Sequence, residues 1–236
     1  IDPGQLAPFK SAIGVLVSDH GFKQPLFYWQ NMDGNIVGAQ YKYIKDNVCL
    51  KRFLKNTDRS NSLWMTPVEG RQALFVTEDP LDAIAHSQLF PEARYAYLCT
   101  GGTSTKAQRQ MIHSFSQKFN LPIILGNDND LAGQLENFKL AYHPVNIEYA
   151  INNKTQRVLI TIKGAEREWG KDEIVTALQA VMKQRPNMVL SIPWAKDWND
   201  DLRNSKKSLS LRIAENMARV QVETTKSEQR GMIVGK

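Results

Sequence analysis

The sequence predicts an α/β fold with a parallel sheet that is flanked by helices and preceded by a small, mainly β subdomain. Short continuous apolar runs, such as ALFVT at 73–77, are typical of strands that are buried on both faces. A segment with helical periodicity follows each run after a short connection, and this alternation indicates parallel strands. Aromatic and β-branched residues before position 68 predict the β subdomain.

Residues 1–68 are the predicted β subdomain. After an N-terminal helix or loop, residues 25–44 are expected to form a β-hairpin, because Asp33 and Gly34 are a strong turn signal between two strand-like runs. Residues 48–56 predict a third extended piece, and the polar stretch 57–62 predicts a loop.

Residues 69–204 are predicted to form the α/β domain. Its first three strands are expected at 73–77, 95–100 and 121–126. The helices that follow them are expected at 80–90, 104–119 and 130–142. Ser104 or Thr103 is the expected N-cap of the second helix, because a hydroxyl there can accept a hydrogen bond from a free backbone N–H.

The second half of this domain has a looser pattern. Residues 143–186 are interpreted as an extended insertion, with two strands around a turn at Asn152 and Asn153 and then a helix. A last core strand at 188–193 leads into the polar stretch 194–204. Residues 205–236 are expected to be a C-terminal helix and tail.

The charge balance favours a polyanionic partner. Thirty Lys and Arg against 24 Asp and Glu give a net charge of +6. Cys49 and Cys99 lie far apart and form no CxxC pair, which excludes a zinc module built from cysteines and favours a reduced, cytosolic setting. No apolar run approaches the roughly 18 residues that a membrane-spanning helix needs.

Polar residues follow each predicted parallel strand, where ligands bind in this class of fold. Glu78 follows the first strand, and Asp128 and Asp130 follow the third. Taken singly, such residues can be turn residues or helix caps. Together, three carboxylates at one edge repel each other unless a cation lies between them, and their oxygens suit Mg²⁺ or Mn²⁺. The other strands are followed by Gly101, Gly102, Lys196, Asp197, Asn199 and Asp200.

These motifs resemble the TOPRIM domain of bacterial-type DNA primases, topoisomerases and some nucleases. That signature is a strand ending in Glu with an Asp four residues later, a glycine turn, and a strand ending in Asp-x-Asp with a Gly soon after. VTEDPLDAIA carries Glu78 and Asp82, LCTGGTSTKAQ carries the glycine turn, and ILGNDNDLAG carries Asp128, Asp130 and Gly133. The resemblance covers about residues 72–142. Gly133 is expected to let the next helix pack closely.

Two further stretches make the resemblance closer to DnaG-type and to phage- and plasmid-type primases. The predicted hairpin is similar to the β subdomain that precedes TOPRIM in those enzymes; Lys42 falls where an arginine is usual, and Lys51 or Arg52 falls near a later basic position. The stretch IPWAKDWNDDL is similar to their closing Lys-Asp-x-Asn-acid motif. One departure is Asp79, where the family usually has glycine. That carboxylate is expected either to alter metal binding or to point to solvent.

The resemblance implies a primase catalytic core that synthesises short RNA primers on a single-stranded DNA template from ribonucleoside triphosphates. It implies Mg²⁺ (or Mn²⁺) as cofactor, a cytoplasmic, bacterial, plasmid- or phage-encoded setting, and a replicative helicase as a further candidate partner. The implied catalytic residues are Glu78, Asp128 and Asp130, which with Asp82 and Asp197 are also the implied metal ligands. The implied nucleic-acid or nucleotide-binding residues are Lys42, Lys51, Arg52, Lys106, Lys196 and Asn199. The residues that either stack on bases or pack within the hairpin are Phe27, Tyr28, Trp29, Tyr41 and Tyr43.

Two other functions remain open at this point. A TOPRIM nuclease would use the same acids to activate water, although the primase-like β subdomain argues against it. A non-catalytic plasmid or phage DNA-binding accessory protein is disfavoured by the intact acidic set. The chain has no room for the separate tyrosine domain of a topoisomerase, and it contains no GxxxxGK[ST] motif of a helicase.

Overall fold

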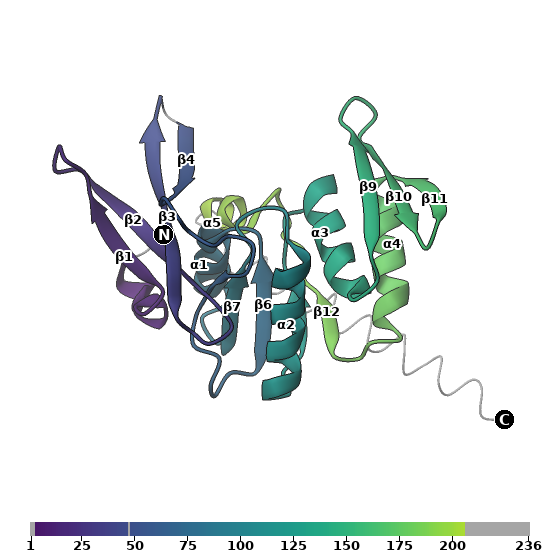
Figure 1. The fold of residues 1–236 in the computed structure, drawn as a ribbon, viewed down its shortest axis with the longest axis horizontal. Coiled ribbons are helices and arrows are strands. Elements are labelled where there is room, and N and C mark those ends of the chain that lie inside the picture. The colour runs from purple at the N-terminus through teal and green to yellow at the C-terminus, as the bar shows by residue number, and fades with distance from the viewer. Residues whose placement is uncertain (1–2, 47, 206–236) are drawn as a thin grey trace.

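The structure is a computed structural model, and it describes residues 3–46 and 48–205. The main sheet has nine strands, with the order β12-β8-β6-β7-β5-β2-β3-β4 and with β1 paired to β2 (Figure 1). The predicted α/β fold is therefore confirmed. The predicted helix and tail beyond residue 205 lie outside the described residues.

Four neighbouring strands of this sheet are parallel, as the apolar runs predict. They are β12 (Met188–Leu190), β8 (Ile123–Leu125), β6 (Ala73–Thr77) and β7 (Tyr95–Cys99). The antiparallel strands are β5 (Leu63–Met65), β2 (Lys23–Gln30), β3 (Ile36–Lys45), β4 (Val48–Phe53) and β1 (Ile13–Val17). β1 occupies part of the expected N-terminal helix or loop, where the only helices are the 3-10 turns Pro3–Gln5 and Ala7–Phe9 within the described residues.

The antiparallel and parallel parts form one continuous sheet. β5 pairs with β2 through Trp64 and Trp29, and with β7 through Trp64 and Cys99. Backbone hydrogen bonding therefore runs across the expected boundary at residue 68. The division into separate domains stays a prediction.

Successive side chains of β6 point to opposite faces of the sheet, and a layer of helices covers each face. Leu74 and Val76 are fully buried on one face, in the core that includes α2 (Lys106–Phe119) and α3 (Leu131–Tyr142). Phe75 is fully buried on the other face, in the core that includes α1 (Pro80–Leu89) and α5 (Trp198–Ser205). Each such side chain contributes about 1.5–3 kcal/mol of burial free energy, which explains why this strand is a continuous apolar run.

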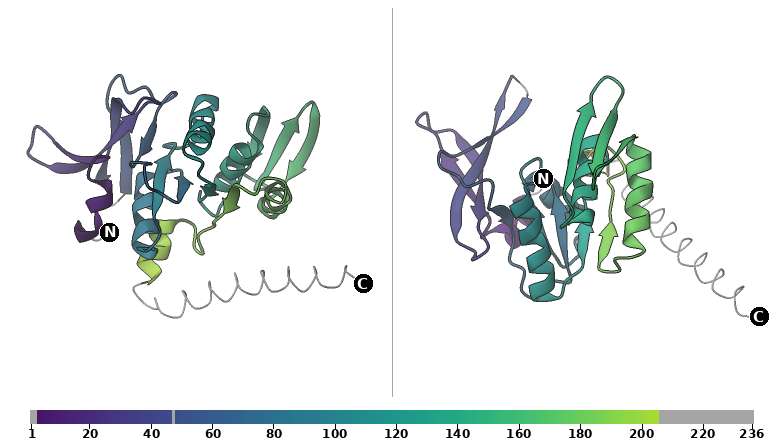
Figure 2. Two further views of the ribbon diagram at one scale, coloured as in Figure 1. Left: turned by 90° about the horizontal axis from the view of Figure 1, so that it is seen from below. Right: turned by 45° about the vertical axis from the view of Figure 1, so that its right-hand side comes forward.

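The two strands and the helix predicted within residues 143–186 are present, with β11 as an additional strand. This unit contains α4 (Lys171–Met182) and a second sheet in the order β11-β10-β9. Val158 and Ile174 of this unit are fully buried in the same core as α3. In both figures this unit (green) and the β1–β4 part (purple to blue) lie on opposite sides of the parallel strands (Figure 1, Figure 2). The strands are β9 (Ile147–Asn152), β10 (Arg157–Ile162) and β11 (Ala165–Trp169).

The N-cap of α2 is Thr105, so the expectation of Ser104 or Thr103 was wrong. The Thr105 hydroxyl accepts a hydrogen bond from the Gln108 N–H, and the Gln108 side chain accepts one from the Thr105 N–H. This reciprocal pair of hydrogen bonds satisfies two free backbone donors. It requires the N-cap to lie three positions before Gln108, which is Thr105. Within the part of the chain that the structure describes, no helix has the length and apolar character of a membrane span.

Candidate active site

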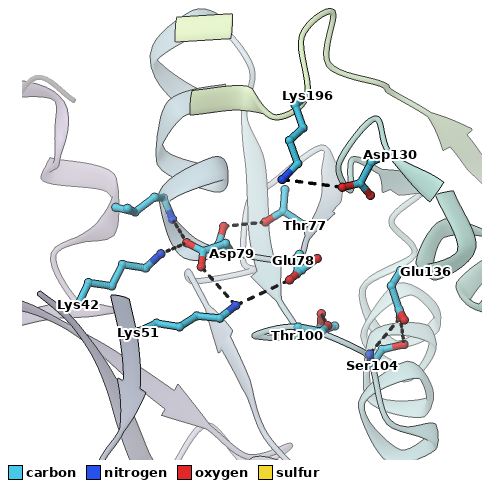
Figure 3. A network of polar contacts seen from close by, with 12 residues as sticks. Lys42, Lys51, Thr77, Glu78, Asp79, Thr100, Ser104, Asp130, Glu136 and Lys196 are labelled. Atoms are coloured by element: carbon cyan, nitrogen blue, oxygen red, sulfur yellow. Dashed lines mark hydrogen bonds and ion pairs between the residues drawn. The ribbon is translucent and has the colours of Figure 1, made fainter. Parts of the chain in front are cut away.

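The acidic residues gather where the parallel strands end. Because β12, β8, β6 and β7 are parallel neighbours, the residues that follow them lie along one edge of the sheet. Figure 3 shows Glu78, Asp79 and Asp130 at this edge, with lysines approaching from two sides. We call the carboxylates of Glu78, Asp128 and Asp130 the acidic edge.

Asp128 lies in the loop between β8 and α3. Of the three acids of the acidic edge, it has the fewest polar partners. Its carboxylate makes no hydrogen bond or ion pair with any residue that the structure describes. Burial is the largest cause that raises the pKa of Asp128, and together with the negative charges of Glu78, Asp130 and Asp197, and against the opposing effect of Lys196, it brings that pKa to about 7. A cation at this position would relieve the repulsion.

Asp130 is both a helix cap and a member of the acidic edge. It is the N-cap of α3, and one carboxylate oxygen accepts a hydrogen bond from the Gly133 N–H at 2.9 Å. The other oxygen lies 3.9 Å from Lys196 Nζ. The N-cap alternative is therefore correct for this residue, and it leaves the second oxygen facing the site.

Gly133 has the expected role in close packing. A Cβ atom on this residue would overlap the backbone of Asp128. Glycine therefore allows the first turn of α3 to lie directly against the loop that positions Asp128.

Glu78 follows β6, and its side chain is 30% exposed, compared with 41% for Asp130. Burial raises its pKa, Lys51 lowers it, and the negative charges of Asp79, Glu136 and Asp130 raise it. A Cβ atom on Gly102 would lie 4.0 Å from Glu78 Oε1. The glycine turn after β7 thus leaves one side of this carboxylate uncovered.

Asp79 does not point to solvent, which corrects one of the two expectations for it. It is the N-cap of α1, where Oδ1 accepts a hydrogen bond from the Leu81 N–H at 2.9 Å. The same oxygen accepts a hydrogen bond from Lys42 Nζ at 2.6 Å, and Lys51 Nζ lies 3.8 Å from Oδ2. The added carboxylate therefore joins the β3–β4 hairpin to α1.

The register of the hairpin decides between Lys51 and Arg52. Lys42 of β3 lies directly opposite Lys51 of β4, so both project from the same face of the sheet. Both reach Asp79. Arg52 projects from the other face, where its guanidinium lies 5.5 Å from the centre of the Tyr43 ring. The structure thus brings Lys51, and not Arg52, to the acidic edge.

The aromatic residues of the hairpin also divide between buried and half-buried positions, because side chains alternate between the two faces of a strand. Phe27 and Trp29 are 1% and 0% exposed, so their role is packing rather than base stacking. Tyr28, Tyr41 and Tyr43 are half-buried, and the two latter rings lie 5.9 Å apart. Because Tyr41 and Tyr43 share the face of Arg52, they lie away from the acidic edge.

Asp82 and the closing motif form a supporting layer beneath the acidic edge. Asp82 is buried in α1 and accepts a hydrogen bond from the Asn199 side chain at 2.6 Å. Burial and the charges of Asp79, Asp128 and Asp197 raise the pKa of Asp82 well above its usual value. Asp197 accepts a hydrogen bond from the Asp200 N–H at the start of α5. Asp82, Asp197 and Asn199 therefore have structural partners, which links α1 to α5.

The contacts of Glu136, Lys139 and Lys171 near the acidic edge were not predicted. Glu136 of α3 forms a buried ion pair with Lys139 and accepts hydrogen bonds from the N–H and hydroxyl of Ser104, at 3.0 and 2.6 Å. It thereby anchors the glycine turn beside Glu78. Lys171 of α4 lies 3.2 Å from the Asn129 side-chain oxygen, between the two aspartates in sequence. These contacts depend on tertiary structure, and only the spacing of Glu136 and Lys139 was a sequence signal.

Lys106 remains outside this network. It is exposed in the first turn of α2, and its charge acts on His143 rather than on the acidic edge. Its role in binding a nucleotide or nucleic acid stays a prediction.

The donor set fits a divalent cation that is held only partly by protein. Among the described residues, no three His, Cys, Asp or Glu side chains form a ready-made metal cage. Mg²⁺ usually binds one or two carboxylates and keeps water and substrate phosphates as its other ligands. The carboxylate of Asp128, together with the second oxygen of Asp130 that lies 3.9 Å from Lys196 Nζ, meets that requirement.

Part of the chain is similar to a known protein family. The sequence model of a family described as Toprim-like matches residues 75–162, which extends beyond the expected limit at 142 and includes β9 and β10. No curated protein sequence matches the chain.

Several solved primase structures are among those similar to this chain. The primase fragment of the bacteriophage T7 primase-helicase protein is 15% identical, with a TM-score of 0.47 over 87% of this chain and 68% of that one. The E. coli primase catalytic core is 12% identical, with a TM-score of 0.41 over 85% and 56%. The RNA polymerase domain of Mycobacterium tuberculosis primase DnaG is 16% identical, with a TM-score of 0.36 over 56% and 51%. The chain thus spans about half to two thirds of these structures.

Proposed function

We propose that the chain is a DNA primase catalytic core, and the match of residues 75–162 to the Toprim-like family model supports this proposal. It would synthesise short RNA primers on single-stranded DNA. One observation carries the proposal: the β3–β4 hairpin brings Lys42 and Lys51 to the same edge as Glu78. A basic hairpin and an acidic edge in one sheet place phosphate-binding cations beside groups that suit a metal.

Asp128 and Asp130 would hold the divalent cation, which we propose to be Mg²⁺ or Mn²⁺. Bound there, the cation would supply Lewis-acid stabilisation of the charge on the transferring phosphoryl group. Asp82 and Asp197 hydrogen-bond to Asn199 and to the Asp200 N–H, and they are proposed to support these two ligands from the neighbouring helices.

Glu78 is proposed to accept the proton of the attacking 3′-hydroxyl group. It is partly exposed, and its raised pKa makes it a better proton acceptor than an ordinary glutamate. Lys51 and Lys196 approach the acidic edge from opposite sides and would attract phosphates, so binding should weaken as salt increases.

The proposed partners are single-stranded DNA, ribonucleoside triphosphates and a replicative helicase. The proposed setting is the cytoplasm of a bacterial host, with the gene on a chromosome, plasmid or phage. Cys49 and Cys99 are both free thiols, which suits a reducing compartment.

A template-directed synthesis assay tests this function. Single-stranded DNA, ribonucleotides and Mg²⁺ should give short RNA products with the wild-type protein and none with Asp128→Asn. Arg203→Gln is a matched control, because Arg203 is exposed and pairs only with Asp200. DNA cleavage without any RNA product would support the nuclease alternative and contradict the proposal.

A further inference from the structure

Two lysines contact Asp79 in different ways. Lys42 has a side chain that is 10% exposed, and its Nζ makes a 2.6 Å hydrogen bond with Asp79 Oδ1. Lys51 is 38% exposed, and its Nζ lies 3.7 Å from Glu78 Oε1 and 3.8 Å from Asp79 Oδ2. Both of these distances are longer than the donor–acceptor distance of a hydrogen bond. Lys51 is therefore shared between two carboxylates and held loosely by each.

Asp79 keeps its position whether or not Lys51 stays. Its Oδ1 atom accepts hydrogen bonds from the Leu81 N–H and from Lys42, which fixes the carboxylate at the start of α1. Its Oδ2 atom faces Lys51. If Lys51 left Glu78, the attraction of Asp79 would keep the ammonium group near the acidic edge.

Lys51 also lies on the strand that is best placed to meet a nucleic acid. β4 forms one end of the main sheet, and exposed cations occur along it and in the residues beside it. Exposed cations on both faces of this strand, with Lys51 on one face and Arg52 on the other, attract the phosphates of a nucleic acid. The exposed cations are Lys45, Lys51, Arg52 and Lys55.

We propose that Lys51 is an exchangeable counter-ion. In the metal-free protein it neutralises Glu78; when a divalent cation binds at the acidic edge, the cation repels the ammonium group, and Lys51 moves to a phosphate oxygen of single-stranded DNA. The DNA ligand rests on the proposed function. Asp79 acts as a positioning residue that keeps Lys51 within reach.

This exchange couples two binding events. Without metal, Lys51 is occupied by Glu78 and contributes little to DNA binding. With metal, it contributes fully, so metal and DNA each strengthen the binding of the other. A lysine that simply contacts DNA would contribute equally in both conditions.

The experiment compares Lys51→Gln with Arg52→Gln, which removes the same charge from the other face of the same strand. Fluorescence anisotropy measures the Kd for a labelled single-stranded oligonucleotide in EDTA and in Mg²⁺, at constant ionic strength and without nucleotides. Lys51→Gln should raise the Kd at least about threefold in Mg²⁺ and leave it unchanged in EDTA. Arg52→Gln should change the Kd by the same factor in both conditions.

A second measurement follows the metal itself. Electron paramagnetic resonance measures the Kd for Mn²⁺ of the DNA-free protein. This Kd should be lower for Lys51→Gln than for the wild type, whereas Arg52→Gln should have a Kd close to that of the wild type. Equal loss of DNA affinity by Lys51→Gln in EDTA and Mg²⁺, or no loss in either, would overturn the exchange. Because no ribonucleotides are present, a failure of primer synthesis would count against the proposed function alone.

Discussion

The indole N–H of Trp198 donates a 2.8 Å hydrogen bond to the carbonyl oxygen of Gly126. Gly126 is two residues before Asp128, whereas Trp198 is the first residue of α5. Trp198 is also buried against Phe75 of β6. The closing motif of the sequence therefore supports the Asp128 loop from beneath, although it lies far away in the chain.

Trp198→Phe should loosen this support. The variant leaves the Gly126 carbonyl without its donor and replaces a fully packed ring by a smaller one, so we expect a loss of about 1–3 kcal/mol in the free energy of unfolding. Chemical denaturation checks this value, and Trp194→Phe is the control because Trp194 is 42% exposed. An unchanged midpoint for Trp198→Phe would contradict the supporting role.

The stability of the metal-free protein should depend on Asp128 ionisation. The folded-state pKa of Asp128 is about 7, above the ordinary value of 3.8, so the fold favours the protonated form. The penalty for ionising it is absent below about pH 4, grows as the pH rises and is complete above about pH 7. Asp128→Asn removes the penalty, which we put at roughly 1–2 kcal/mol after allowing for solvent screening.

Thermal melting between pH 5 and pH 8 checks this prediction. The wild type should lose stability relative to Asp128→Asn as the pH rises, and Mg²⁺ should restore it at pH 8 in the wild type only. Parallel melting curves for the two proteins over this range would show that Asp128 does not carry the effect.

Gly133→Ala should disturb the first turn of α3. The added Cβ overlaps the backbone of Asp128, which cannot move without shifting the loop. We expect a loss of about 2–3 kcal/mol in unfolding free energy, together with weaker Mn²⁺ binding. Gly170→Ala is the matched control, because its Cβ would have only ordinary contacts, 3.6 Å from Arg157 and Glu173. Equal stability of the two variants would refute the packing argument.

Lys42 and Asp79 should show strong energetic coupling. Lys42→Met leaves the Asp79 carboxylate with less compensation in a mostly buried place, whereas Asp79→Asn retains an N-cap residue and removes the charge. The double variant should be more stable than the sum of the single changes predicts, by about 1–3 kcal/mol. A double-mutant cycle measured by urea denaturation gives this term, and strict additivity would argue against a structural ion pair.

The main features of the fold and of the acidic edge could be predicted because they depend on local patterns. β6 is a continuous apolar run, and Glu78, Asp128 and Asp130 follow strands in the order that the family motif requires. β5 and β11 have only three and five residues, so they lack a distinct period. Their strand conformation depends on pairing with neighbours.

The roles of single side chains depended on register and tertiary contacts. Lys51 and Arg52 are adjacent in sequence, and only the pairing of β3 with β4 shows which one faces Asp79. The N-cap role of Asp79 follows from its position before Pro80, but its ion pair with Lys42 joins residues 37 positions apart. No local pattern specifies such a contact.

The continuous sheet has a mechanical consequence. Trp64 pairs with Trp29 on one side and with Cys99 on the other, so the basic hairpin and the acidic edge belong to one rigid frame. Separating them would require breaking the backbone hydrogen bonds between paired strands, which needs far more free energy than a rotation about a flexible linker. Under the proposed function, the growing RNA and its template would therefore slide across a fixed surface, while loosely held side chains such as Lys51 move with each step.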